Sequence, residues 1–202
     1  MFHSAASVGT QNVSSNAIQN IKPSKMTIEK YLKDHIPHRI NLLVTFQKRF
    51  ANLSDDKREN VRDLFRCSKD ISMLMARFLL GELGIKLKKN DTKLSPEKDD
   101  DWKKRIKDLN LKTLNLDDIN PNSQLYKDIF IILKAANRAV AHLHDIDVDH
   151  EIKTKDEEPI LIRVIEFTLK AIKENFYDST GFDFDGIMSS ANNNMHRDRF
   201  QL

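Results

Sequence analysis

The sequence is poor in the residues that make tight turns or covalent cross-links. Its 202 residues include five glycines, five prolines and a single cysteine. One cysteine excludes an internal disulfide and any zinc site built from several cysteines, and it suits a reducing compartment. Scarce glycine and proline leave few positions for tight turns and favour long helices. The composition therefore predicts an all-α fold.

Long hydrophobic runs and an excess of one charge are also lacking. No apolar stretch is long enough to cross a bilayer, and the N-terminus lacks the apolar run of a secretory signal. We therefore expect no membrane partner and a cytoplasmic protein. The 33 basic and 30 acidic residues give a formal net charge of +3, and the two signs are interspersed. This balance allows nucleic-acid binding without requiring it.

The chain does contain enough apolar sequence for one folded domain, because 40% of its residues are hydrophobic. Residues 1–25 are rich in Ser, Asn and Gln, and we expect them to form a disordered leader. Residues 26–180 are expected to form a four- or five-helix bundle with a charged connection at residues 86–120. Residues 181–202 are expected to be a flexible tail.

Apolar residues recur at steps of three and four in the first half of the chain. A first helix is predicted at residues 27–53, with a kink or restart at Pro37, which lacks an amide donor. A second helix is predicted from the N-cap Ser54 to Gly81 or Gly84. Its core face is predicted to contain Val61, Leu64, Phe65, Ile71, Leu74, Met75, Phe78 and Leu79.

The remaining segments give three further expectations. Within the second helix, Cys67 is expected to be a buried, unreactive thiol. The connection at residues 86–120 is predicted to be a mobile loop or to carry a short helix around Trp102, which folds back onto the bundle. Two more long helices are predicted, one starting at Asn120 and Pro121, and a largely buried one starting near Pro159. Beyond them, we expect the phenylalanines of the tail to tuck under the bundle: Phe182 and Phe184.

Polar residues that could carry chemistry gather in one run, ANRAVAHLHDIDVDH, at residues 136–150. At about 100° per residue, His142 falls about 40° from Arg138, so both lie on a face that the core stripe of this helix does not use. His144 falls about 120° from Arg138, near the edge of that stripe. Ala135 and Ala139 share the outer face and would let a partner helix approach closely, as in a homodimer. The alternative is an ordinary solvated helix face.

A metal site is a second interpretation of the same run. Its possible ligands are His142, His144, Asp145, Asp147, Asp149 and His150. On a helix the first two histidines point about 200° apart, and the aspartates lack the glycine and terminal glutamate of an EF-hand loop. We therefore predict no metal and no cofactor, and we interpret the aspartates as a polar helix exit.

Two other polar groups could hold a phosphate. Near the expected restart at Pro37, basic side chains could meet exposed amides: His35, His38 and Arg39. Opposite the predicted core face of the second helix lies an arginine strip, Arg62, Arg66 and Arg77, together with Asp70, which is four residues from Arg66 and is expected to form a surface ion pair with it. For each group the alternative is the solvated polar face of an amphipathic helix.

The spacing of Arg138 and its histidines resembles that of HEPN domains. In this family an arginine and a histidine with four to six residues between them lie late on a long helix of a compact helical bundle. Arg138 and His144 have five residues between them, and the resemblance extends over residues 27–177 by helix layout. Two features depart from the pattern: Ala139 stands where the family often has a polar residue, and His142 is one residue short of the spacing.

The resemblance implies a metal-independent ribonuclease that works as a homodimer, in some members a toxin or a phage-defence protein. One histidine, His142 or His144, would then act as general acid or base on the ribose 2′-hydroxyl and the 5′ leaving oxygen. Arg138 would hold the phosphate, and Asn137 could orient either partner. Other members of the family only bind. The alternative is therefore a non-catalytic module for RNA or for a protein such as an antitoxin.

Overall fold

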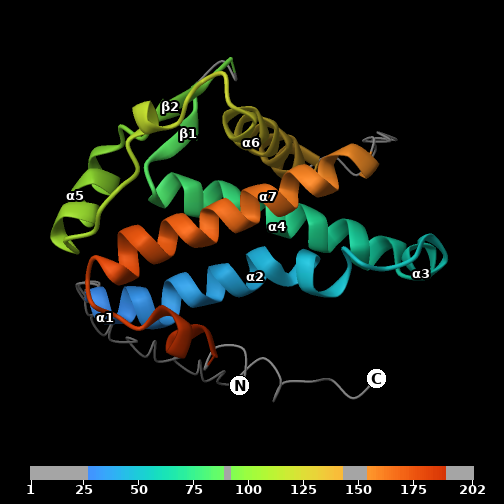
Figure 1. The fold of residues 1–202 in the computed structure, drawn as a ribbon, viewed down its shortest axis with the longest axis horizontal. Coiled ribbons are helices and arrows are strands. Elements are labelled where there is room, and N and C mark those ends of the chain that lie inside the picture. The colour runs from blue at the N-terminus through green and yellow to red at the C-terminus, as the bar shows by residue number, and fades with distance from the viewer. Residues whose placement is uncertain (1–26, 89–91, 143–153, 190–202) are drawn as a thin grey trace, which may run out of the picture.

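The computed structural model describes residues 27–88, 92–142 and 154–189. Its four long helices form a bundle, in which α7 crosses in front of α4, with α2 below and α6 above (Figure 1). Their bounds are Ile36–Arg49 for α2, Arg62–Glu82 for α4, Gln124–His142 for α6 and Thr154–Ile172 for α7. The predicted all-α bundle is confirmed. The predicted leader lies outside the described residues.

The first helical region changes its winding before Pro37, where a restart was predicted. Helix α1 (Ile28–Lys30) passes into a π-helical turn, Tyr31–His35, and α2 follows directly with Pro37 in its first turn. Because proline has no amide to donate, the carbonyl of Leu32, five residues back in the wide turn, accepts a hydrogen bond of 2.6 Å from the hydroxyl of Tyr177 instead. The wide turn places Tyr31 and Leu32 in the core.

The second helical region is broken where a single helix was predicted. Helix α3 (Asp55–Asn60) follows Ser54 and ends at Val61, whose φ of −123° and ψ of 27° are not helical. Helix α4 then begins at Arg62. It ends before Gly84, whose φ of +96° is a left-handed conformation that glycine adopts without steric cost.

The predicted core face of α4 is wrong at three of its largest residues. Leu64 is 65% exposed, Ile71 40% and Phe78 52%, and Cys67, predicted to be buried, is exposed. Because α4 is apolar on two sides, the helical period alone does not select the side that packs. The buried side carries smaller and mixed residues: Phe65, Ser68, Lys69, Ser72, Met73, Ala76, Leu79 and Leu80.

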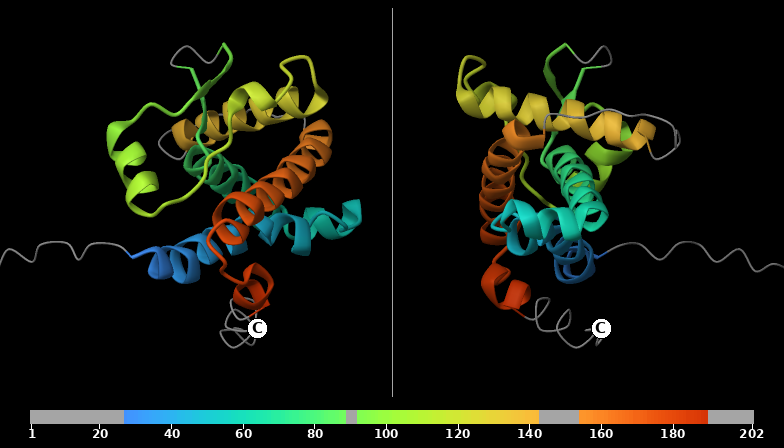
Figure 2. Two further views of the ribbon diagram at one scale, coloured as in Figure 1. Left: turned by 60° about the vertical axis from the view of Figure 1, so that its left-hand side comes forward. Right: turned by 90° about the vertical axis from the view of Figure 1, so that its right-hand side faces the viewer.

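The charged connection is more ordered than a loop. Strands β1 (Ile85–Leu87) and β2 (Leu94–Pro96) pair antiparallel, and α5 (Asp100–Asp108) follows. The short helix predicted around Trp102 is confirmed, and the hairpin was not predicted. Asp99 caps α5, because its Oδ1 accepts a hydrogen bond of 2.8 Å from the backbone amide of Trp102. Figure 2 shows α5 and the hairpin at one end of the bundle.

The last two long helices differ from prediction at their starts. Helix α6 begins at Gln124 rather than at Asn120, because the carboxamide oxygen of Asn120 accepts from the amide of Asn122 and holds a turn there. Helix α7 begins five residues before Pro159 and continues into a π-helical turn, Lys173–Asp178.

The tail also differs from prediction, because residues 184–189 are helical, although regular structure was expected to end at Gly181 or Gly186. Phe184 packs edge-on against Tyr177, with the ring centres 5.0 Å apart, and Phe182 is half-buried. The predicted burial of the two phenylalanines is therefore confirmed in its outline.

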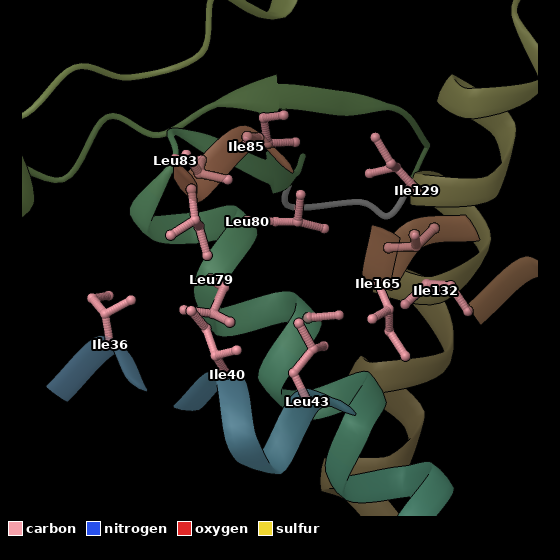
Figure 3. Packing of buried hydrophobic residues seen from close by; sticks show 14 of the residues in the cluster. Ile36, Ile40, Leu43, Leu79, Leu80, Leu83, Ile85, Ile129, Ile132 and Ile165 are labelled. Carbon is pink, nitrogen blue, oxygen red and sulfur yellow. The ribbon is translucent and has the colours of Figure 1, made fainter. Parts of the chain in front are cut away.

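The core lies where the four long helices and β1 converge (Figure 3). The side chains that meet there come from every layer: Ile36, Ile40 and Leu43 from α2, Leu79 and Leu80 from α4, Ile85 from β1, Ile129 and Ile132 from α6, and Ile165 from α7. Each of them is fully buried. Within the described residues, no helix combines the length and the apolar character that crossing a membrane requires.

Candidate functional site

A pocket of about 450 Å³ opens between the C-terminal half of α4, the hairpin, α5 and α6. This volume is within the usual range for sites that bind small molecules or nucleotides. Two aromatic side chains line it, Phe78 and Trp102. The rest of the wall is rich in charge, with three basic and three acidic residues: Arg77, Lys86, Arg105, Glu82, Glu97 and Asp99. Asn137 of α6 completes the lining.

The buried carboxylate of Glu82 organises one wall of this pocket. Arg105 Nη2 lies 2.9 Å from Oε1 and 2.8 Å from Oε2 of Glu82. The hydroxyl of Tyr31 donates to Oε2 at 2.8 Å, and Arg39 Nη1 donates to Oε1 at 3.4 Å. Trp102 Nε1 donates to the backbone carbonyl of Glu82 at 3.3 Å. Glu82 therefore ties α5 and the first helical region to the end of α4.

The ionisation of this cluster follows from its burial and its pairing. Burial raises the pKa of the Tyr31 hydroxyl, and the neighbouring negative charge of Glu82 raises it further. Burial alone would lower the pKa of Arg105, but its hydrogen bonds and attraction to Glu82 outweigh burial and raise that pKa. Tyr31 thus stays a neutral donor and Arg105 a cation. Glu82, surrounded by these donors, therefore holds this wall of the pocket together.

The other charges of the pocket are mostly paired as well. Lys86 contacts the carboxylate of Glu97 across the hairpin. Burial alone would raise the pKa of Glu97, but hydrogen bonds from Lys86 and from two backbone amides hold it below its ordinary value. Arg77 is exposed, and among the described residues it forms no hydrogen bond or ion pair. Its guanidinium is therefore the cation of this wall that is available to an anionic ligand.

The predicted site residues fall at the end of α6, beside this pocket. Asn137 lines it, and the backbones of Arg138 and His142 belong to the following helical turns. His144 lies outside the described residues. The helix therefore reaches His142 without a break, as the predicted 40° separation from Arg138 requires.

One part of the predicted outer face of α6 is wrong. Ala135 was expected there with Arg138, yet it is only 4% exposed. Its burial follows from the close packing of α7 along α6, which is also tied by Arg163 Nε donating to Asp128 at 2.7 Å. Ala135 therefore cannot serve as a contact for a partner helix.

The other predicted polar groups separate in the structure. Arg39 belongs to the Glu82 cluster, His35 stacks on Tyr31 with ring centres 6.4 Å apart, and His38 is exposed. No group of three metal-ligating side chains occurs within the described ranges, and the acidic end of the 136–150 run lies outside them. Of the arginine strip on α4, Arg77 alone reaches the pocket.

Two of the three basic residues of the pocket had no functional signal in the sequence. Arg105 and Lys86 lie in the charge-dense connection, where no periodic pattern separates them from their neighbours. Arg77 was noted only as part of a polar strip. They meet because the hairpin and α5 fold back over the end of α4, an arrangement that depends on tertiary contacts.

Comparison of the chain with protein-family models, curated proteins and solved structures finds no match.

Proposed function

We propose that this protein is a ribonuclease whose site is formed at the end of α6 by Arg138, Asn137 and a histidine, His142 or His144. One observation carries the proposal: Asn137, which directly precedes Arg138, lines a pocket whose wall offers the exposed guanidinium of Arg77. The resemblance of the Arg138 spacing to HEPN domains supports the same chemistry. Arginine side chains suit this role because the guanidinium binds phosphate oxygens through two parallel hydrogen bonds.

The proposed reaction uses the ribose of the substrate as the nucleophile. A histidine takes the proton from the 2′-hydroxyl, whose oxygen attacks the adjacent phosphorus. The bond from phosphorus to the 5′ oxygen breaks, and this oxygen leaves with a proton from a histidine or from water, so that a 2′,3′-cyclic phosphate remains. Arg138 holds the phosphate and stabilises the charge that develops on it, and Arg77 binds a neighbouring phosphate.

The test is cleavage of a labelled single-stranded RNA in the presence of a chelator. The wild type is expected to cleave it, and an RNA with one 2′-deoxy nucleotide at the cleaved position is expected to resist. Arg138→Ala is expected to lower the cleavage rate about 100-fold or more, since removing one donor to a developing oxyanion commonly costs this much. Asn137→Ala is expected to lower it less.

The matched control is Arg49→Ala, which removes an exposed arginine from the last turn of α2 instead of α6. Its cleavage rate is expected to equal that of the wild type. The single variants His142→Ala and His144→Ala identify the histidine that acts. A wild type that binds RNA without cleaving it would overturn the ribonuclease proposal in favour of a binding module. Equal cleavage by Arg138→Ala and Arg49→Ala would overturn the site.

A further inference from the structure

The exposed apolar residues of α4 follow the spacing of a helix-pairing seam. Leu64, Cys67, Ile71, Leu74 and Phe78 recur at alternating steps of three and four residues. This is the a and d pattern by which two helices pack along each other. Leu64, Cys67, Ile71 and Phe78 are exposed and Leu74 is half-buried, so the seam has no partner within the described part of the chain. We name these five residues the α4 seam.

We propose that the α4 seam is a homodimer interface, in which α4 of a second copy packs antiparallel along it. A two-fold axis between Ser72 and Met73 sets Ile71 against the second copy's Leu74 and Cys67 against its Phe78. The same register sets Leu64 against the second copy's Gly81, where added atoms would meet nothing within 4 Å. Each large side chain at the two ends of the seam therefore faces a small one, as close packing of helices requires.

The charges beside the seam fit the same register. Asp70, which also has an interaction within its own chain, and Arg77 lie on one edge of the seam, seven residues apart. In an antiparallel pair this edge faces the same edge of the second copy. Arg77 then lies about 3 Å along the axis from the position opposite the second copy's Asp70, at about 1.5 Å per residue. Because the axis repeats this contact, opposite charges meet twice across the interface.

The surroundings of α4 also favour an antiparallel partner. Glu82 lies one residue beyond Gly81, the next position of the seam, and is covered by α5 through Arg105 and Trp102. In a parallel pair, the two copies of α5 would meet at the same end. In the antiparallel register, the partner's α4 begins with Arg62 opposite Leu83, where α5 closes the face. The exposed length of α4 therefore matches the length of the partner helix that packs along it.

This interface does not rest on the proposed ribonuclease activity, since the apolar seam is independent of Arg138. Arg77 is shared with the proposed site, where the five donors of its guanidinium suffice to hold a phosphate and the second copy's Asp70 together. It borders the candidate site, because Phe78 belongs both to the seam and to the pocket lining. The N-terminal half of the second copy's α4 would therefore form one rim of the pocket. The tests below measure association, so they can fail or succeed whatever the outcome of the RNA assay.

The first test is the mass of the full chain by sedimentation, over protein concentrations from about 1 to 100 μM. The wild type is expected to be a dimer. Ile71→Asp is expected to raise the dissociation constant about 100-fold or more, because the axis places two carboxylates in the apolar centre. The matched control Arg66→Asp changes an exposed residue of the same helix about 140° from Ile71, and it is expected to remain a dimer. Far-UV circular dichroism checks that both variants fold.

Charge reversal tests the register. Arg77→Asp is expected to weaken the dimer by placing like charges opposite each other, and Asp70→Arg combined with Arg77→Asp is expected to restore it. Only a second copy of this chain carries both changed residues, so a partner of any other sequence would not restore association in the double variant. Loss of the dimer in the double variant to the extent seen in the single variant would overturn this register.

Disulfide trapping tests the direction of the pair. Under mild oxidation, Phe78→Cys is expected to form a cross-linked dimer with Cys67, and Cys67→Ser combined with Phe78→Cys is not. The wild type is expected to give no cross-link, because the two copies of Cys67 are far apart in an antiparallel pair. A Cys67 cross-link in the wild type would overturn the antiparallel arrangement. A monomeric wild type would overturn the proposal. This holds both if Cys67 reacts freely with thiol reagents and if another segment of the chain covers it and blocks the reaction.

Discussion

The buried carboxylate of Glu82 gives the most quantitative test of how the pocket wall is held together. Its side chain is 11% exposed, and it accepts hydrogen bonds from Arg105, Tyr31 and Arg39. Glu82→Gln keeps the size and one acceptor oxygen but removes the charge and points an amide donor at one of these donors. The variant therefore isolates the electrostatic contribution of the cluster from its packing.

The magnitude follows from the exposure of the partners. Hydrogen bonds to a charged group contribute about 1.5–3 kcal/mol each in partly buried settings. Breaking a fully buried ion pair costs about 3–5 kcal/mol. The side chains of Arg105 and Arg39 are 38% and 32% exposed, so water stabilises them once Glu82 is neutral. We therefore expect Glu82→Gln to lower the free energy of unfolding by about 2–3 kcal/mol, below the fully buried limit.

Urea unfolding followed by circular dichroism measures this change, and the slope of the transition should stay constant. The midpoint of thermal unfolding is expected to fall by about 4–12 °C for a domain of this size. Tyr31→Phe, which removes one donor, is expected to cost about 1–2 kcal/mol. A loss below about 0.5 kcal/mol for Glu82→Gln, or a larger loss for Tyr31→Phe than for Glu82→Gln, would refute the reasoning.

Two further predictions concern α6 and the two glycines in and just after the last turn of α4. Burial alone would raise the pKa of Asp128, but its hydrogen bonds with Arg163 hold that pKa below its ordinary value. The ion pair therefore stabilises the fold above the ordinary pKa of an aspartate, and this contribution is lost as pH falls through the lowered folded-state pKa. The deficit of Asp128→Asn against the wild type, measured by urea unfolding, should therefore shrink in acid; an unchanged deficit would contradict the ion pair. Gly84→Ala is expected to cost about 1–2 kcal/mol, because an alanine at its positive φ is strained and its Cβ would lie 3.4 Å from Trp102. Gly81→Ala is expected to stabilise the monomer by up to about 1 kcal/mol, because Gly81 has helical geometry and alanine favours a helix. An equal effect of Gly81→Ala and Gly84→Ala on the free energy of unfolding would contradict the left-handed conformation at Gly84.

The fold class and the positions of the long helices could be predicted from the sequence, because apolar periodicity and helix-breaking residues are local signals. The side of α4 that faces the core could not. Leu64, Ile71 and Phe78 are more apolar than Ser68 and Ser72, yet the serines are buried, because α2 packs closely on the side with small residues. A local pattern cannot distinguish a core stripe from an apolar stripe that faces solvent.

The candidate site was predictable only in part. Asn137 and the helix that extends to His142 follow from a short motif on a regular helix. The pocket beside them depends on a hairpin of two three-residue strands and on the return of α5 over Glu82. Strands this short have no detectable period, and the contacts join residues more than twenty positions apart, such as Arg105 and Glu82. Tertiary packing therefore creates the charged wall that the sequence did not reveal.

The proposed function is tested most directly by the ratio of two cleavage rates, those of Arg138→Ala and Arg49→Ala on the same RNA in chelator. Both changes remove one arginine from a helix, so the loss of positive charge is matched. The account predicts that Arg138→Ala is slower by about 100-fold or more, with a 2′,3′-cyclic phosphate as the product of the control. Equal rates, or a wild type that leaves the RNA intact, would contradict it.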